Sequence, residues 1–134
     1  MIYRIETILL KGKSGSGKTN FIHNLIQKAQ SKDWRIGGIT APGIFQNRHR
    51  YKFNVYDIST SQTMELAKRN MNSHINFGCF GFYEKAILFG TKVIEKAIQD
   101  NADIIVIDEV GPLELDNKGW DTALKKINEK KKKK

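Results

Sequence analysis

Apolar and polar residues alternate with two different periods along this chain of 134 residues. Residues 3–10 end in an apolar run typical of a strand, whereas residues 20–31 repeat apolar side chains at helical spacing. Residues 84–99 carry one apolar stripe and predict a second helix. Residues 104–107 are four consecutive β-branched apolar residues, which favour a strand buried on both faces of a parallel sheet. The pattern therefore predicts an α/β fold.

Between the two helices, the pattern predicts a β-hairpin. Residues 36–40 form a short apolar segment that we interpret as a second strand. Residues 44–45 and 51–58 flank a polar, basic tip at residues 46–50, and the second flank alternates aromatic or apolar with polar side chains. We therefore expect two antiparallel strands joined at a basic turn.

The segments after this hairpin have weaker patterns. Residues 64–70 are interpreted as one helical turn or an irregular excursion, and residues 75–83 as extended. Within the extended segment, Cys79 is expected to be a small buried apolar residue. A final helix is expected from about residue 118 to residue 130.

A glycine-rich motif of the form G-x-x-x-x-G-K-[ST] joins the first strand to the first helix. Its residues are Gly12, Lys13, Ser14, Gly15, Ser16, Gly17, Lys18 and Thr19. The backbone N–H groups of such a P-loop point at phosphate oxygens, its lysine reaches the β- and γ-phosphates, and its Ser/Thr hydroxyl lies on Mg²⁺. Strand, loop and helix is the context that the motif requires. The sequence therefore predicts a nucleoside-triphosphate site with Lys18 as a catalytic contact and Thr19 as a metal ligand.

Two other interpretations of this loop are weaker. A flexible Gly/Ser-rich turn would not require the lysine and threonine that follow it. A dinucleotide-binding G-x-G-x-x-G would need a third glycine where Asn20 stands.

A pair of carboxylates follows the most apolar strand. Asp108 and Glu109 come directly after residues 104–107, and a hydrophobic strand that ends in Asp downstream of a P-loop is the Walker B arrangement. Ligands of open α/β sheets bind at the carboxyl ends of strands. We expect Asp108 to hold Mg²⁺ through water and Glu109 to orient or deprotonate the attacking water.

Composition limits the remaining function classes. The net formal charge is +9, and five of the positive charges belong to the lysine run 130–134. This run could bind nucleic acid electrostatically, but a disordered, solvated end is the interpretation we favour. A single cysteine excludes an internal disulfide and fits a cytoplasmic protein. No segment has the ~20 apolar residues of a membrane span, so no membrane partner is expected.

Four segments together resemble the THEP1-type nucleoside-triphosphatase family of P-loop proteins. They are residues 12–19, 37–40, 48–58 and 108–115. The last segment reads DEVGPLEL, and its part after the two carboxylates is more specific to the family than a Walker B strand alone. The resemblance implies Mg²⁺-dependent hydrolysis of ATP, GTP and other triphosphates to diphosphate and phosphate, with broad base tolerance.

The expected fold is a P-loop NTPase three-layer sandwich with a mostly parallel central sheet and an inserted β-hairpin. Members of the family usually continue past the last helix with another strand and helix, whereas this chain ends in lysines. We therefore expect one domain at residues 1–129 that lacks a final strand and helix, followed by a disordered tail at residues 130–134.

An additional cation commonly stabilises the transition state of phosphoryl transfer. Arg48 and Arg50 at the hairpin tip are the candidates for this role, and a solvated basic hairpin is the alternative.

Three other functions remain open at this point. The chain could be a GTP-binding accessory protein resembling the MobB-like partner of molybdenum-cofactor assembly, which also carries a P-loop on a small α/β domain. It could be a kinase for a small molecule or nucleic-acid end, although residues 59–74 are short for a lid and contain only Arg69 as arginine. It could also bind RNA through its lysine run, for which the sequence indicates no aromatic stacking platform.

Overall fold

The computed structural model describes residues 18–108, with side chains from Asn20 onward. Its elements are α1 (Lys18–Ser31), β1 (Ile36–Thr40), β2 (Gly43–Gln46), β3 (His49–Asp57), β4 (Thr63–Arg69), β5 (Ile75–Phe77), β6 (Phe80–Phe82), α2 (Glu84–Gln99) and β7 (Ile104–Ile107). The strand expected at residues 3–10 and the helix expected at residues 118–130 lie outside the described residues.

Most of the elements expected inside this range are confirmed. Both helices, the short strand β1 and the apolar strand β7 have the positions that the sequence pattern predicts. The β2–β3 hairpin turns at Asn47 and Arg48, whose φ angles of 50° and 66° are typical of the tight turns that match strand twist. Residues 75–83 are extended as expected, as the hairpin β5–β6.

The strands form one sheet in the order β5-β6-β4-β3-β1-β7, and β2 pairs with the outer half of β3. Among the described strands, only β1 and β7 are parallel, with Ile36 opposite Ile104 and Ile39 opposite Ile107. The other pairs are antiparallel. The expectation of a mostly parallel sheet is therefore wrong for the described part of the chain, because short turns connect β2, β3, β4, β5 and β6 without a crossover helix.

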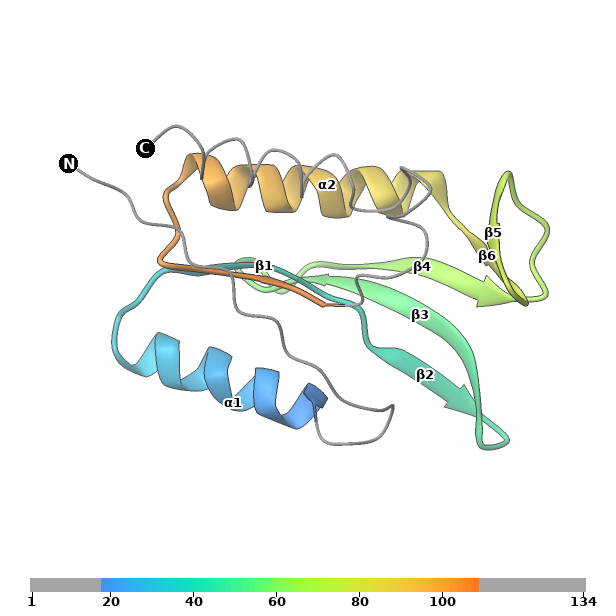
Figure 1. Ribbon diagram of the computed structural model, residues 1–134, viewed down its shortest axis with the longest axis horizontal. Helices are drawn as coiled ribbons and strands as arrows, with labels where there is room; N and C mark the ends of the chain where they lie inside the picture. Colours follow the sequence, from blue (N-terminus) through green and yellow to red (C-terminus); the bar gives the residue numbers. More distant parts are fainter. Residues whose placement is uncertain (1–17, 109–134) are drawn as a thin grey trace.

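The two helices cover opposite faces of the sheet (Figure 1). On one face α2 packs Ala86, Ile87 and Ile94 against a cluster that includes Ile39 and Val55. On the other face α1 packs against a smaller cluster. Its members are Ala29, Ile36 and Ile58, with Ile26, Tyr56, Ile104 and Val106 packed against them. This arrangement gives a three-layer α/β/α order over β1 and β7, and each residue of β7 is half-buried.

Strand β4 differs from the expectation of a helical turn or irregular excursion. Its sequence TMELAKR is rich in good helix formers, yet it pairs with β3 on one side and β6 on the other. A register shift in its pairing with β3 accompanies two consecutive buried residues, Leu66 and Ala67. Burial of these side chains under α2 and pairing on both edges outweigh the helix propensity of the segment.

Cys79 also differs from its expected place. It lies in the β5–β6 turn and is exposed. The Arg69 guanidinium donates a hydrogen bond to its sulfur at 3.1 Å. Gly78, beside it, has φ 58°, so the turn places this residue pair outside the core.

Strand β1 passes close to β7 at Gly38, and this contact leads to a stability prediction. Gly38 has φ 109°, and a Cβ built there would lie 2.0 Å from the Val106 carbonyl oxygen. Gly38→Ala is expected to lower the free energy of unfolding by about 2–5 kcal/mol, because positive-φ strain and the overlap with a neighbouring strand add together. Urea unfolding followed by circular dichroism measures this loss.

Gly78→Ala is the matched control. Gly78 also has a positive φ, but nothing lies within 4 Å of a Cβ built there. This variant is expected to lose about 1 kcal/mol through backbone strain alone. Equal losses for the two variants would show that the β1–β7 contact does not require glycine.

Neither helix of the described residues is long and apolar enough to cross a membrane.

Candidate nucleotide site

Three features of the predicted nucleotide site meet at one end of the sheet. Helix α1 begins at Lys18, within the glycine-rich motif, as the motif requires. The carboxyl ends of β1 and β7 lie at the same end of the molecule as this helix start (Figure 1). Asp108 is the first residue after β7. The topology therefore brings Lys18 and Asp108 to one end of the sheet, although 90 positions separate them in the sequence.

The position of Asp108 follows from the pairing of β7 with β1. The Asp108 N–H donates a hydrogen bond to the Ile39 carbonyl at 3.2 Å, which continues the parallel ladder by one residue. The residue is half-buried. Asp108 therefore lies at the carboxyl end of β7 and is partly accessible, which suits a residue predicted to contact a bound ligand.

The first turn of α1 contains no acidic residue, and Lys28 lies in its last turn. The partial positive charge of a helix N-terminus attracts anions, and no carboxylate of the first turn neutralises it here. The helix start is therefore electrostatically suited to a phosphate group.

A magnesium ion fits the donor chemistry at this edge. Mg²⁺ in nucleotide sites takes one or two protein oxygens and completes its shell with water and substrate phosphates. Among the described residues, no three His, Cys, Asp or Glu side chains gather into a metal cluster. Asp108 supplies a hard oxygen donor at the rim, which matches the small share of ligands that a phosphate-bound Mg²⁺ requires from the protein.

Several predicted site residues lie outside the described part. They are Gly12, Lys13, Ser14, Gly15, Ser16 and Gly17 of the loop and the carboxylate Glu109. Lys18 and Thr19 are placed by their backbone, as the first two residues of α1. The roles of all these residues stay predictions.

The two hairpin arginines have different surroundings. Arg48 is exposed in the turn between β2 and β3. The Arg50 guanidinium lies over two aromatic rings, 5.9 Å from the centre of Phe45 and 5.4 Å from that of Phe53. Arg48 is therefore the more accessible of the two, whereas Arg50 is held by the hairpin itself.

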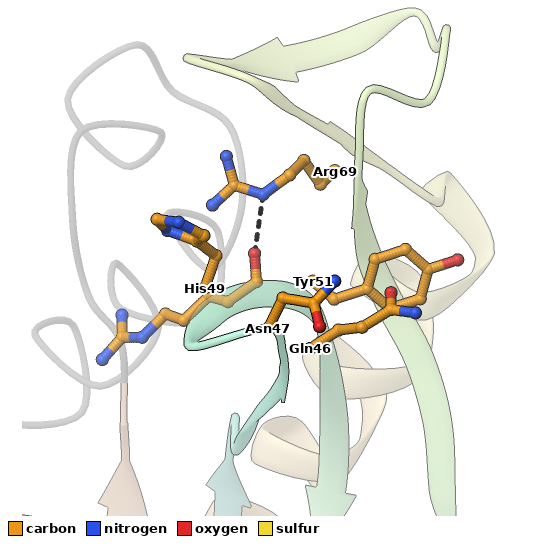
Figure 2. A pocket seen from close by; sticks show the side chains of 6 residues that line it. Gln46, Asn47, His49, Tyr51 and Arg69 are labelled. Carbon is orange, nitrogen blue, oxygen red and sulfur yellow. Dashed lines mark hydrogen bonds between the residues drawn. The ribbon is translucent and has the colours of Figure 1, made fainter.

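Beside the hairpin tip is an open hollow of about 280 Å³. It is lined by Gln46, Asn47, His49, Arg50, Tyr51 and Arg69. Figure 2 shows Arg69 reaching from β4 toward His49, with the Tyr51 ring directed away from both. The Arg69 Nε–H donates to the Arg50 carbonyl at 2.8 Å. The lining contains two guanidinium groups and no carboxylate, so this hollow favours anions.

The opposite face of β3 and β4 is ion-paired instead. Lys52 lies 3.3 Å from the Glu65 carboxylate. The hydrogen bond from Tyr83, together with the Lys52 ammonium group, holds the pKa of Glu65 below its usual value, and the same hydrogen bond raises the pKa of Tyr83. Lys68 lies 5.4 Å from the centre of the Tyr51 ring, and its hydrogen bond with Tyr51 raises the pKa of Lys68. Glu65 therefore stays ionised and offsets the lysine charge on this face.

Sequence reasoning missed the part played by Arg69. The sequence indicates Arg69 only as the single arginine of residues 59–74, a stretch too short for a lid, whereas the residue lies on β4, which pairs with β6, and donates a hydrogen bond to the β2–β3 hairpin. The alternation of β4 side chains across the sheet would have been the indication, but the helix-forming composition of the segment hides it.

Known proteins resemble this chain in sequence and in fold. A sequence model of the family described as "NTPase" matches residues 7–134. This chain belongs to the THEP1-type nucleoside-triphosphatase family. The matched range includes residues 12–19, the β2–β3 hairpin and the Asp108–Glu109 pair.

Two archaeal members of the THEP1 family are among its relatives. The nucleoside-triphosphatase THEP1 of Sulfolobus acidocaldarius is 31% identical over 120 residues, which cover 90% of this chain and 69% of the relative. The THEP1 of Saccharolobus solfataricus is 31% identical over 108 residues, covering 81% of this chain and 61% of the relative. The chain thus spans 61% to 69% of the length of these two THEP1 proteins.

Solved structures share the fold of this THEP1-family chain. The solution structure of a human cancer-related nucleoside triphosphatase superposes with a TM-score of 0.66 at 22% identity, covering 86% of this chain and 65% of that chain. The crystal structure of THEP1 from Aquifex aeolicus superposes with a TM-score of 0.67 at 19% identity, covering 84% and 64%. At these identities the likeness establishes the mixed α/β fold.

Proposed function

We propose that this protein is an Mg²⁺-dependent nucleoside-triphosphate phosphohydrolase with broad base tolerance. The observation that carries the proposal is the start of α1 at Lys18 at the same end of the sheet as Asp108. Membership of the THEP1 family supports the same activity. In this proposal ATP, GTP and other triphosphates are substrates, and water is the acceptor.

In this proposal, different residues of the site bind the phosphates, position the attacking water and hold the metal. The loop amides and Lys18 hold the β- and γ-phosphates, and the N-terminus of α1 adds its partial positive charge. Glu109 orients a water molecule and accepts its proton as the water oxygen bonds to the γ-phosphorus. The bond from that phosphorus to the β,γ-bridging oxygen breaks, and the diphosphate leaves. Bound Mg²⁺, held by Thr19 and through water by Asp108, would neutralise charge on the phosphates.

The hairpin arginines enter this proposal unequally. A cation that contacts the transition state is worth about 10³–10⁵ in rate where one exists. Arg48 is exposed at the tip and could approach a bound triphosphate. Arg50 would have to leave the Phe45 and Phe53 rings to do so. We therefore rank Arg48 before Arg50 as the charge stabiliser.

The test is phosphate release from ATP, GTP, CTP and UTP, with Mg²⁺ and with a chelator in its place. Release from several triphosphates that stops when the metal is removed supports the proposal. Tight nucleotide binding without release would overturn hydrolysis and favour an accessory protein or a kinase. Release from one triphosphate only would overturn the broad base tolerance.

Asp108→Asn is expected to lower kcat/KM by about 10- to 100-fold, the usual effect of a group that holds a metal through an outer-shell contact. Because the loss arises from metal affinity, higher Mg²⁺ concentration should restore part of the rate. Asp100→Asn is the matched control, since Asp100 is exposed and its described ion pair is with Lys96 on α2. If Asp108→Asn hydrolysed triphosphates at the rate of the unmodified protein and with the same Mg²⁺ dependence, Asp108 would not hold the metal.

A further inference from the structure

Aromatic and guanidinium side chains form a row across the antiparallel strands β2 to β6. The row consists of Phe45, Arg50, Phe53, Arg69, Phe80 and Phe77, on β2, β3, β4, β6 and β5. Strand pairing places Phe45 opposite Arg50, and Phe80 opposite both Arg69 and Phe77. Residues directly opposite one another lie on the same face of a sheet, so these side chains share one surface.

Contacts link five members of this row, from Phe45 to Phe80. The Arg50 guanidinium lies over Phe45 and Phe53, and the Arg69 guanidinium lies 5.0 Å from the centre of Phe80. The Phe53 and Phe80 rings meet edge to face with their centres 5.1 Å apart. The hydrogen bond from Arg69 to the Arg50 carbonyl joins the two arginines. These five side chains are thus held in place by one another, and Phe77 joins them through the pairing of β5 with β6.

The two ends of the row face solvent. Phe45 is 61% exposed and Phe77 is 50% exposed, so both rings are accessible to a partner. The middle members Phe53 and Phe80 pack against the core under α2. The row therefore combines a rigid base with two exposed aromatic rings.

Charge on this part of the molecule favours an anionic partner. Residues 43–82 contain five Lys and Arg residues and two carboxylates. Both carboxylates have partners away from the row: Glu65 pairs with Lys52, and Asp57 is buried and accepts hydrogen bonds from Ser59 and Thr60. The row therefore combines positively charged arginines with aromatic rings, and the hollow that favours anions lies beside it.

We propose that this aromatic–arginine row binds single-stranded nucleic acid, with unpaired bases stacked on Phe45 and Phe77 and phosphates beside Arg50 and Arg69. Every base has a π-face that stacks on an aromatic ring, and arginine contributes both charge and a planar surface. A sheet surface that presents aromatic rings is one way in which proteins hold unpaired bases. The site is distinct from the predicted nucleotide site, because the row shares the sheet face with α2 whereas the P-loop helix α1 covers the other face.

The experiment is fluorescence anisotropy of the full chain with labelled single-stranded oligonucleotides of about 12 nucleotides, a length within the range of known single-strand sites. Phe45→Ala/Phe77→Ala is expected to weaken binding by about 30-fold or more, because base–aromatic stacking contributes affinity at each of the two rings. Both side chains are exposed, and circular dichroism checks that the variant is folded. Binding that is unchanged in a folded variant would overturn the proposal.

Trp34→Ala is the matched control. Trp34 is 51% exposed and has Lys32 over its ring at 6.0 Å, but it lies outside the row, between α1 and β1. Its loss should leave oligonucleotide affinity unchanged. An equal loss for Trp34→Ala and the double variant would show that the aromatic effect is not specific to the row.

The lysine run 130–134 is the main competing source of affinity, so the measurement is repeated with these five lysines replaced by glutamine. If the lysine-to-glutamine chain still binds the oligonucleotide, and this binding still requires Phe45 and Phe77, the row is supported. If the lysine-to-glutamine chain no longer binds, and Phe45→Ala/Phe77→Ala has no effect when the lysines are present, the affinity belongs to the lysine run. Oligouridine and oligothymidine of equal length distinguish RNA from DNA. A duplex that binds as tightly as single strands, or displacement by ATP with Mg²⁺, would overturn base stacking on this surface.

Discussion

Replacing Lys18 by alanine is expected to remove most nucleotide binding and turnover. Its ammonium group is predicted to contact the β- and γ-phosphates at the start of α1. A charge-assisted hydrogen bond of this kind corresponds to about 10- to 100-fold in Kd. Because the contact strengthens as charge develops on the γ-phosphate, kcat/KM should fall further, by about 10²–10³-fold. Titration with a fluorescent nucleotide and phosphate release measure the two effects.

Lys28→Ala is the control for this experiment. Lys28 lies on the same helix but in its last turn, and its side chain is exposed. The Lys28→Ala substitution removes one positive charge from the helix but leaves the predicted P-loop unchanged. If Lys18→Ala bound nucleotide with the affinity of the Lys28 variant, the P-loop assignment would be wrong.

Replacing Glu109 by glutamine is expected to separate binding from hydrolysis. Glutamine keeps the shape of the side chain but cannot accept the proton of the attacking water. Loss of a positioned general base lowers rates by about 10²–10⁴-fold. Nucleotide affinity should stay close to that of the unmodified protein, since the proposed role of Glu109 concerns water and not phosphate. Single-turnover phosphate release with saturating protein measures the chemical step directly.

Glu84→Gln is the matched substitution for comparison. Glu84 begins α2 and is exposed, so its change tests the general effect of removing a carboxylate. Turnover of Glu109→Gln at the rate of Glu84→Gln would refute the water-positioning role. A parallel loss of binding and hydrolysis in Glu109→Gln would instead assign the residue to nucleotide or metal binding.

The elements that sequence reasoning identified correctly are those whose information is local. Helix α2 follows from the apolar stripe of residues 84–99, and α1 follows directly after a motif that requires a helix. Strand β7 follows from four β-branched residues in a row. In each case the side chains that specify the element lie within a few positions of one another, so no tertiary information is needed.

The sheet direction shows where local information is insufficient. The β-branched run at residues 104–107 predicts a strand of a parallel sheet, and this strand, β7, does pair with β1 in parallel. The same reasoning extended to the whole sheet is wrong in the described range, because β3 to β6 are joined by turns and pair antiparallel. Strand β4 was missed for a related reason: its composition favours a helix, and only its two neighbouring strands give it extended partners.

The sequence by itself determined the chemistry predicted for this protein: the P-loop residues, the Asp108–Glu109 pair and the two helices are specified by contiguous residues whose spacing carries the meaning. The tertiary structure alone decided which distant residues share a surface. Phe45, Arg69 and Phe77 are separated by up to 32 positions, and strand register places them in one row. Because a shift of one residue would move a side chain to the other face, such a surface exists only once the strands are paired.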